Sequence, residues 1–295
     1  MKRIGNLYEK VCSIENLQLA DEKARKGKLR TYGVIEHDKN REANLLKLRE
    51  TLLNGTFHTS KYDVFTIYEP KEREIYRLPY FPDRILHHAI MNVLEPIWVS
   101  TFTADTYSCI KNRGIHAAAK KVKQALREDP EGTTFCLKLD IRKFYPSINH
   151  DVLKSILRRK LKDKRLLRLL DEIVDSADGV PIGNYLSQYF ANLYLTYFDH
   201  WIKEQKRVKH YFRYADDIVI LASDKSYLHS LMGEIRAYLG DLKLEVKGNW
   251  QVFPVAARGI DFVGYVFFHT HTRMRKGIKK TSVSYTHLRA HETLA

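Results

Sequence analysis

The stretch Tyr211–Leu221 reads YFRYADDIVIL and places two adjacent aspartates, Asp216 and Asp217, inside an otherwise apolar and aromatic run. Ionised carboxylates are costly to bury unless positive charge compensates them. Two strands joined by a tight turn would present the pair at the tip of a hairpin, where cations reach it. A lone Asp-Asp pair is more commonly a solvated turn, so this interpretation depends on what the rest of the chain supplies.

A third carboxylate comes from an upstream strand. In residues 134–141, Cys136, Lys138 and Asp140 alternate with apolar side chains, and this period of two indicates a strand. Asp140 ends the strand on the face opposite its leucines. Mg²⁺ prefers oxygen ligands and typically takes one or two carboxylates together with substrate phosphates. We therefore expect Asp140, Asp216 and Asp217 to act together as the carboxylates of a two-metal site.

Helices and strands are mixed along the chain without a βαβα rhythm, which predicts an α+β fold. Residues 1–56 are expected to be helical, and Asp83 is expected to cap a helix that follows Pro82. The other expected helices cover residues 115–127, 150–174, 185–204 and 227–239. The other expected strands cover residues 62–68, 75–79, 242–246, 251–255 and 260–268, with two more flanking Ala215–Asp217.

Charge and composition limit the possible partners and compartment. The 295 residues include 50 Lys and Arg against 35 Asp and Glu, a formal charge of +15. This excess favours a polyanion such as nucleic acid, although an inert basic surface or an anionic membrane also fits it. No apolar run is long enough to span a bilayer, and the basic N-terminus has no signal-peptide pattern. Three widely spaced cysteines fit a reducing cytoplasm.

Two segments resemble the aspartate motifs of reverse transcriptases: LKLDIRKFYPSI (137–148) and YFRYADDIVIL. The resemblance implies a right-hand polymerase with fingers and palm that adds dNTPs to a DNA or RNA primer on an RNA template. It implies two Mg²⁺ ions, which Mn²⁺ can replace, held by Asp140, Asp216, Asp217 and the backbone carbonyl of Ile141. Among bacterial and phage enzymes of this kind, the cytoplasm is the expected location.

The resemblance also implies the residues that bind the incoming nucleotide. Within residues 68–97, Arg77 matches the arginine that clamps the triphosphate, and Lys71 is either a second clamp or a surface lysine. Tyr145, preceded by Phe144, matches the aromatic that excludes a 2′-hydroxyl, with a core tyrosine as the alternative. Lys247 either approaches the triphosphate, as a general acid toward pyrophosphate, or is a surface lysine.

Template and primer contacts are expected from three further regions. Residues 103–120 match the family where it lies along the template, and residues 260–268 resemble the hairpin that grips the primer. Arg84 either contacts the template or pairs with Asp83. The full set of expected template and primer residues is Arg84, Arg113, Gly114, Tyr214, Phe262, Val263, Gly264 and Tyr265.

The stretch GVPIGNYLSQ (179–188) bears on the type of retroelement. Many reverse transcriptases carry Gln-Gly here, whereas this chain has Ile182-Gly183, followed by Gln188. This pattern resembles the enzymes of diversity-generating retroelements, which copy a template RNA with low fidelity and work with a small basic accessory protein. Retron, group II intron and abortive-infection enzymes are the alternatives within the class. A non-catalytic RNA-binding palm protein is the alternative outside it.

The expected domain order follows from the same resemblance. Residues 1–56 form a helical extension, 57–132 the fingers, 133–268 the palm and 269–282 the start of the connection to a thumb. Residues 283–295 interrupt this order, since VSYTHLRAHET (283–293) looks like the translation of a sequencing-library adapter. We therefore expect residues 283–295 to be non-native and the thumb to be largely missing.

Overall fold

The structure, a computed structural model, describes residues 3–68 and 72–278. Lys71 and the adapter-like residues 283–295 lie outside the described residues. The chain forms two compact units, one from residues 1–102 and 143–197 and the other from 103–142 and 198–295. Both units mix helices and strands, and the predicted α+β class is confirmed. The expected fingers and palm boundaries stay a prediction.

Helices make up most of residues 3–56 in the first unit, as predicted. α2 buries Leu17, Ala20 and Ala24 and packs on α5, where the Asn16 side chain donates to the Ala89 carbonyl at 3.0 Å. The helices of this segment and the one they pack on are α1 (Tyr8–Cys12), α2 (Ile14–Ala24), α3 (Tyr32–Asp38), α4 (Arg41–Asn54) and α5 (Ile85–Val99).

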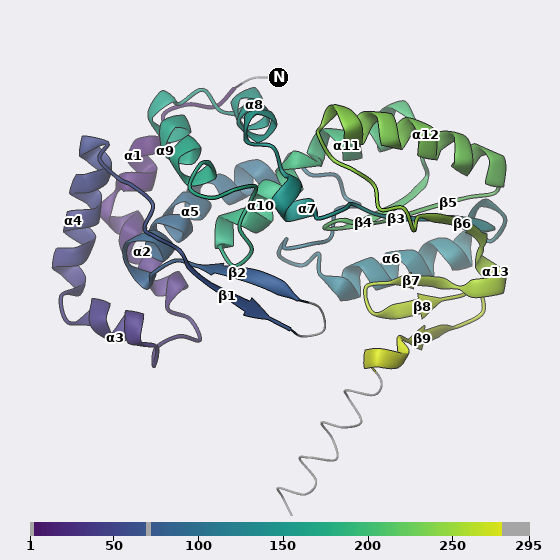
Figure 1. The fold of residues 1–295 in the computed structure, drawn as a ribbon, viewed down its shortest axis with the longest axis horizontal. Helices are drawn as coiled ribbons and strands as arrows, with labels where there is room; N and C mark the ends of the chain where they lie inside the picture. The colour runs from purple at the N-terminus through teal and green to yellow at the C-terminus, as the bar shows by residue number, and fades with distance from the viewer. Residues whose placement is uncertain (1–2, 69–71, 279–295) are drawn as a thin grey trace, which may run out of the picture. The chain divides into compact units, whose positions relative to one another are not determined.

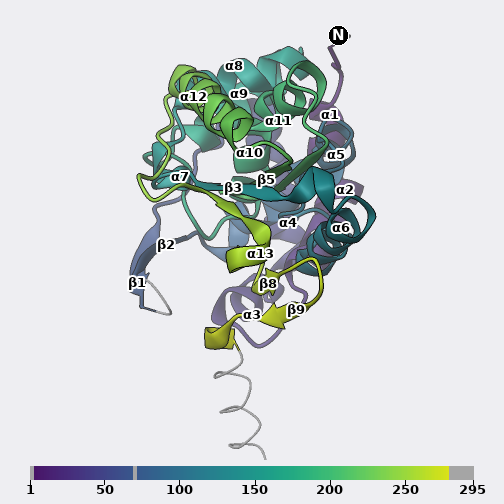
Figure 2. The ribbon, with the colours of Figure 1, turned by 90° about the vertical axis from the view of Figure 1, so that its right-hand side faces the viewer.

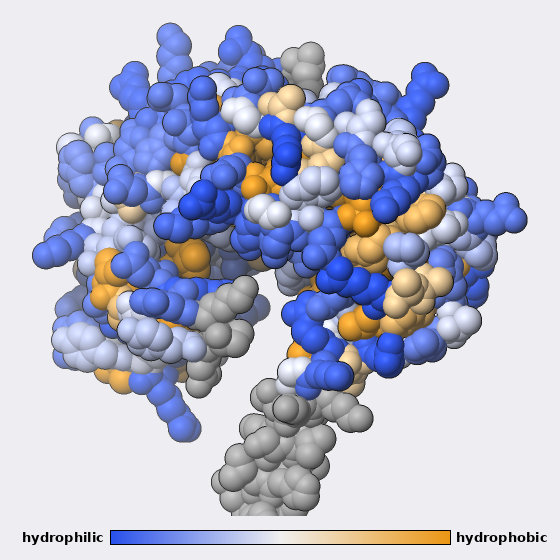
Figure 3. Space-filling model, turned by 45° about the vertical axis from the view of Figure 1, so that its right-hand side comes forward, coloured by the Kyte–Doolittle hydropathy of each residue, from blue (hydrophilic) through white to orange (hydrophobic). Residues whose placement is uncertain are grey.

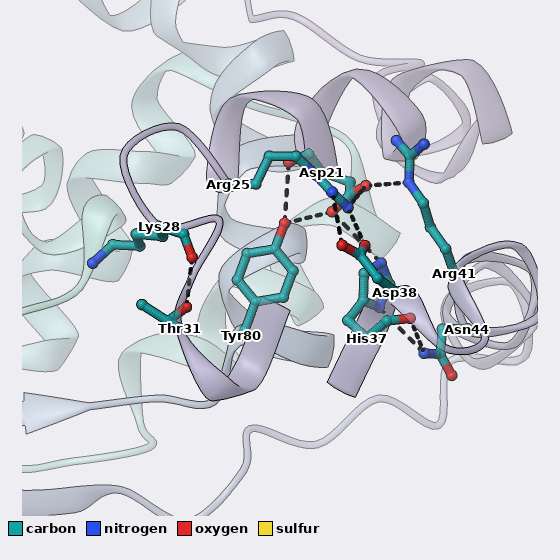
Figure 4. A network of polar contacts seen from close by, with 9 residues as sticks. All are labelled: Asp21, Arg25, Lys28, Thr31, His37, Asp38, Arg41, Asn44 and Tyr80. Atoms are coloured by element: carbon teal, nitrogen blue, oxygen red, sulfur yellow. Dashed lines mark hydrogen bonds and ion pairs between the residues drawn. The ribbon is translucent and has the colours of Figure 1, made fainter. Parts of the chain in front are cut away.

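A buried carboxylate anchors these helices to one another (Figure 4). Asp21 is fully buried in α2 and accepts hydrogen bonds from Arg25 at 2.8 Å, from Arg41 at 2.6 Å and from the Tyr80 hydroxyl. Burial alone would raise the pKa of Asp21, but the hydrogen bonds from Tyr80, Arg41 and Arg25 outweigh it and lower that pKa. The ionised form therefore joins α2, α4 and the turn that precedes α5.

The start of α5 differs from the sequence prediction. Asp83 does not cap the helix but lies inside a π-helical turn, Tyr80–Arg84, that runs directly into α5. Its buried carboxylate accepts instead from the backbone N–H of Ser60 at 3.0 Å. Arg84 donates to the Ala24 carbonyl at 3.3 Å. The prediction was wrong because a long-range partner took the oxygen that a local cap would have used.

The remaining elements of the first unit include a hairpin of β1 (Asp63–Ile67) and β2 (Arg73–Arg77), paired antiparallel. The helical prediction for residues 150–174 resolves into two helices, whose N-caps Asn149 and Asp163 accept from Val152 N and Leu166 N. The predicted helix 185–204 is likewise subdivided. The helices of the first unit after residue 143 are α7 (Phe144–Ser147), α8 (His150–Lys160), α9 (Lys164–Val174) and α10 (Tyr185–Tyr194). The chain passes into the second unit within α11 (Thr196–His200), and a π-helical turn, Trp201–Gln205, follows there.

The second unit is built on an antiparallel sheet in the order β4-β5-β3-β6. α12 covers one face, where Leu137 and Leu139 are buried, and α6 with the β7–β9 sheet covers the other, where Cys136 is buried (Figures 1 and 2). The elements are α6 (Ile115–Glu128), a 3₁₀ turn Glu131–Thr133, β3 (Phe135–Asp140), β4 (His210–Tyr214), β5 (Asp217–Ala222), α12 (Lys225–Asp241), β6 (Gln251–Pro254), α13 (Val255–Arg258), β7 (Ile260–Phe262), β8 (Tyr265–Phe267) and β9 (Thr272–Met274).

Two strand predictions in this unit are corrected. Residues 242–246 form no strand and contribute only a single antiparallel bridge, between Val246 and Ile141. Lys243 adopts a left-handed conformation (φ 59°), and the Leu244 N–H bonds back to Leu239 at the end of α12, so the segment closes a helix. The predicted strand 260–268 is instead the hairpin β7–β8, turned at Val263.

None of the helices in residues 3–68 and 72–278 combines the length and apolarity that a bilayer-spanning helix needs. Hydrophilic residues dominate the face seen in Figure 3, with smaller apolar patches among them.

Candidate active site

The predicted aspartate hairpin is present, and it brings the three carboxylates to one end of the sheet. β4 and β5 pair antiparallel around the turn that contains Asp216, and Asp217 pairs in register with both Tyr214 on β4 and Asp140 on β3. Directly opposed residues of antiparallel strands have Cα atoms about 4.5–5.5 Å apart and side chains on the same face. Asp140 and Asp217 are therefore neighbours, and the Ile141 N–H bonds to the Asp216 carbonyl at 3.3 Å.

A buried ion pair that the sequence analysis missed supports this turn. The Arg213 guanidinium on β4 donates to the Asp199 carboxylate through Nε at 2.7 Å and Nη2 at 2.6 Å, and both side chains are fully buried. Tyr211 and Thr106 donate to the same carboxylate at 2.5 and 2.9 Å. Nη1 of Arg213 donates at 3.1 Å to the carbonyl of Ala215, which adopts a left-handed conformation (φ 55°). The arginine thus holds the residue that precedes the aspartate pair.

Two lysines lie against the three carboxylates. The Lys138 ammonium on β3 forms an ion pair with Asp217, and Lys247 Nζ is 4.0 Å from Asp140 Oδ2. The backbone N–H of Lys247 also donates to the Asp140 carbonyl at 2.9 Å. Burial lowers the pKa of Lys138 to about 8, against the opposing effect of Asp140. Lys247, predicted either to approach the triphosphate or to be a surface lysine, thus lies beside Asp140, and its role stays a prediction. Lys138 had not been singled out.

The carboxylates fit a divalent cation by their chemistry. Burial raises the pKa of Asp216, and the charge of Asp140 raises it further. A cation would relieve this repulsion, and all the side-chain donors are the hard oxygens that Mg²⁺ prefers. Among residues 3–68 and 72–278, no three or more His, Cys, Asp and Glu side chains are grouped around one possible ion position, and lysines contact two of the aspartates. Metal binding stays a prediction.

The hairpin predicted to grip a primer lies in the same unit. Phe262 is fully buried at the end of β7, and Val263 (φ 44°) and Gly264 (φ 89°) make the turn into Tyr265 on β8. The Lys138 ammonium lies 5.3 Å from the centre of the Phe262 ring. Lys138 therefore contacts both the aspartate hairpin and the β7–β8 hairpin.

A basic groove of about 840 Å³ brings together two residues predicted separately to contact template or primer. Arg113, just before α6, and Tyr265 on β8 both line it, and Lys123 lies 5.9 Å from the Tyr265 ring. Arg113 also donates to the Thr103 carbonyl at 2.9 Å, and Gly114 is the N-cap residue of α6. The other cationic or titratable residues along the groove are His116, Lys120, Lys121 and Arg127.

Arg77, the residue predicted to clamp the triphosphate, belongs to the first unit, whereas Lys247 belongs to the second. Arg77 ends β2, pairs with Asp63 and lies 5.5 Å from the Phe65 ring. A pocket of about 170 Å³ is lined by Arg77, Arg84 and Gly183. Its other lining residues are Lys28, Phe65, Ile75, Tyr76, Leu78, His87, Asn184 and Tyr185. Lys28 had not been predicted, since an isolated lysine in a charged helical segment carries no signal of its own.

The Ile182-Gly183 segment docks on β2. The Ile182 carbonyl accepts from the Tyr76 N–H at 2.8 Å. Gly183 has φ +124°, and a Cβ at this position would meet the Tyr76 carbonyl oxygen at 2.7 Å. A side chain here would therefore clash with the strand that ends at Arg77.

The other predicted nucleotide residues lie on short elements of the first unit. Phe144 is buried and Tyr145 half-buried in α7, with their rings edge to face at 5.6 Å. Gln188 is exposed on α10. The roles of these residues stay predictions.

Known proteins provide an independent comparison. Residues 69–267 match the family model described as "Reverse transcriptase (RNA-dependent DNA polymerase)". Protein YkfC of Escherichia coli K12 is 25% identical over 274 residues, covering 77% of this chain and 71% of that protein. The group II intron-encoded protein LtrA of Lactococcus lactis is 23% identical over 191 residues, covering 60% of this chain and 31% of LtrA.

Solved telomerase structures show the same fold at low identity. The structure from Candida albicans, in complex with a fragment of telomeric RNA, gives a TM-score of 0.55 at 14% identity, and covers 80% of this chain and 49% of that one. Apo telomerase from Candida tropicalis gives 0.54 at 12%, covering 74% and 49%. The chain thus spans about half of these telomerase chains and about a third of LtrA.

These matches confirm the predicted right-hand polymerase fold with fingers and palm. The family model covers about two thirds of the chain and includes all three aspartates, the two hairpins around them and the segment with Ile182. The chain therefore belongs to the reverse transcriptase family.

Proposed function

We propose that this protein is an RNA-directed DNA polymerase that extends a primer 3′-hydroxyl with dNTPs on an RNA template. The pairing of Asp140 with Asp217, beside Asp216 at the hairpin turn, is the observation that carries the proposal. The three carboxylates and the Ile141 carbonyl would hold two Mg²⁺ ions, which Mn²⁺ can replace. When bound, such ions supply charge stabilisation for the attacking and leaving oxygens.

The chain's own residues perform the remaining tasks of this reaction. Lys247, 4.0 Å from Asp140, is placed to donate a proton to the leaving pyrophosphate. Arg77 binds the triphosphate, because a guanidinium fork matches phosphate oxygens. Tyr145 excludes a 2′-hydroxyl, and Phe262–Tyr265 hold the primer end.

The basic groove along α6 binds the nucleic-acid backbone in this proposal. It runs from Arg113 to Arg127 beside Tyr265, a length of about 20 Å at 1.5 Å per helical residue. Lys120 and Lys123 contribute further positive charge, and each phosphate contact releases counterions. An aromatic ring between basic side chains suits a base or sugar as well as the phosphates.

The subtype proposal is a diversity-generating retroelement, and Ile182 supports it, because an aliphatic side chain offers shape without hydrogen bonds. A small basic accessory protein is then a further partner. The intron-type alternative has its own support, since several relatives with significant similarity are intron-encoded proteins or intron maturases. Misincorporation frequency on an RNA template distinguishes the two.

Primer extension on an RNA template with Mg²⁺ tests the activity. Asp216→Asn should lower the rate at least about a hundredfold, the usual effect of removing one electrostatic stabiliser of a transition state. Asp241→Asn is the matched control, since Asp241 is an exposed carboxylate at the end of α12, and it should leave the rate unchanged. Undiminished extension by Asp216→Asn would overturn the carboxylate mechanism, whereas no extension by the unmodified protein would leave RNA binding as the function.

A further inference from the structure

Lys138 is a cation built into the carboxylate face of the sheet. It precedes Asp140 by two residues on β3, so both side chains point to the same face. It pairs across the sheet with Val219, and Asp217 is its diagonal neighbour on that face. Its ammonium forms an ion pair with Asp217, and the two side chains are only 22% and 25% exposed.

The second contact of Lys138 fixes where its charge lies. The ammonium is 5.3 Å from the centre of the Phe262 ring, and Phe262 is fully buried in β7. A cation over an aromatic face is attracted to it, and more strongly where water is excluded. Lys138 therefore lies between the aspartate hairpin and the β7–β8 hairpin. Its side chain contacts Asp217 on one side and Phe262 on the other, and these contacts hold it against the carboxylates.

Lys138 and Lys247 together nearly neutralise the site. Asp140, Asp216 and Asp217 contribute three negative charges, and the two lysines contribute two positive ones through their contacts with Asp217 and Asp140. Two divalent cations would then add four positive charges to a site with a net charge of about −1. A triphosphate, with a charge of about −4, restores the balance. Electrostatics at these short separations are strong when the groups are partly buried.

We propose that Lys138 is a positioning residue that holds Asp217 in the metal-free enzyme and makes divalent-cation loading depend on the arrival of the triphosphate. This inference rests on the proposed function. Without Lys138, the carboxylates repel one another more strongly and bind a divalent cation more tightly in the absence of nucleotide. With Lys138, that affinity is weak until the triphosphate supplies the missing negative charge.

Mn²⁺ binding to the full chain, followed by the electron paramagnetic resonance signal of free Mn²⁺, tests the inference without turnover. Lys138→Met should bind Mn²⁺ alone at least about tenfold more tightly than the unmodified protein. Lys138→Arg keeps the charge and should stay within about twofold. Lys225→Met removes an exposed lysine at the first position of α12 and is the matched control, with no change expected.

A second measurement tests the dependence on nucleotide. A non-hydrolysable dNTP should tighten Mn²⁺ binding to the unmodified protein, because each of two coupled ligands changes the affinity for the other by the same factor. The dNTP should tighten Mn²⁺ binding to Lys138→Met by a several-fold smaller factor. Circular dichroism checks that the variants fold, and Lys138→Gln replaces Lys138→Met if the latter does not. Unchanged or weaker Mn²⁺ binding by the folded neutral variant would show that Lys138 only props Phe262, and would overturn the inference.

The two proposals fail in different ways. Primer extension by the unmodified protein, combined with no effect of Lys138→Met on Mn²⁺ binding, would remove the inference and keep the polymerase. No extension on any RNA template, combined with the expected Mn²⁺ pattern for Lys138→Met alone, would remove the polymerase and reduce Lys138 to a counter-ion of a metal site.

Discussion

Replacing Asp199 with asparagine should destabilise the protein more than any surface change of the same kind. The substitution keeps the shape of the side chain but removes the negative charge that compensates the fully buried Arg213. It also weakens the two charge-assisted hydrogen bonds from Arg213, which are 2.7 and 2.6 Å long. Breaking a buried ion pair by removing one partner costs about 3–5 kcal/mol. Because whole domains have unfolding free energies of only about 5–15 kcal/mol, this loss is readily measured.

Urea unfolding followed by circular dichroism gives the free energy of unfolding for Asp199→Asn. The pair Arg275–Asp261 is a built-in comparison, with a similar Nε–Oδ1 distance of 2.7 Å but side chains 47% and 53% exposed. Asp261→Asn should therefore cost no more than about 1 kcal/mol. A loss below about 1 kcal/mol for Asp199→Asn, matching the exposed pair, would refute the reasoning.

A double variant separates pairing from burial. Asp199→Leu with Arg213→Met removes both charges, so it should be less destabilised than the sum of the two single variants, and the difference measures their coupling. Arg213 also holds the Ala215 carbonyl at 3.1 Å, so the double variant should lose primer extension even where it regains stability. Full extension by a stable double variant would show that the turn does not depend on Arg213.

The remaining predictions concern the first unit. Burial lowers the pKa values of His87 and His88 to about 3 and about 4, below the unfolded value of about 6.5. The free energy of unfolding should therefore fall as pH drops from about 6.5 toward 4, by up to about 1.4 kcal/mol per pH unit for each histidine. Urea unfolding of His87→Leu should show a flatter pH dependence, and an equally steep one would contradict the assignment. Asp21→Asn should cost about 1.5–3 kcal/mol in thermal or urea unfolding, because hydrogen bonds to a charged group are lost, whereas Asp38→Asn at the exposed edge of the same network should cost less. Ile182→Gln should lower misincorporation opposite template adenine in sequenced extension products, and an unchanged error spectrum would remove Ile182 as a determinant of fidelity.

The sequence predicted correctly those strands whose apolar pattern can be recognised from residues adjacent in the chain. The alternation in residues 134–141 identified β3, and the apolar run interrupted by Asp216-Asp217 identified the β4–β5 hairpin. The same reasoning failed at residues 242–246, where the β-like composition of Leu242–Val246 is overridden by the left-handed Lys243 that closes α12. The conformation of one residue, Lys243, determines the structure of this segment, and the spacing of apolar residues does not predict that conformation.

Contacts between residues far apart in the sequence could not be predicted, and several of them shape the site. Arg213 is a charged residue among the aromatic residues of YFRYADD, but nothing in the sequence links it to Asp199, and it was not predicted. The Asp83 oxygen went to Ser60, more than twenty residues away, instead of capping its own helix. Lys138 was visible as a polar position of β3, yet its significance depends on Phe262, which only the β7–β8 hairpin brings beside it.

The carboxylates of the second unit are compensated by two kinds of cation, unlike the buried Asp83 of the first unit, which accepts from the backbone N–H of Ser60. We infer that the kind of cation separates structural from functional carboxylates. Asp199 is compensated by an arginine through two hydrogen bonds with no exposure on either side, so nothing from solution can replace that partner. Asp140 and Asp217 are compensated by lysines, whose point charges sit on flexible stems at 36% and 22% exposure. Beside these lysines Asp140 and Asp217 keep 33% and 25% of their side-chain surface exposed, although Oδ1 of Asp217 itself is buried. Asp199, held by the guanidinium fork, is fully buried. We therefore expect Asp140 and Asp217 to be the carboxylates that bind cations, whereas the arginine makes Asp199 a carboxylate that holds the fold.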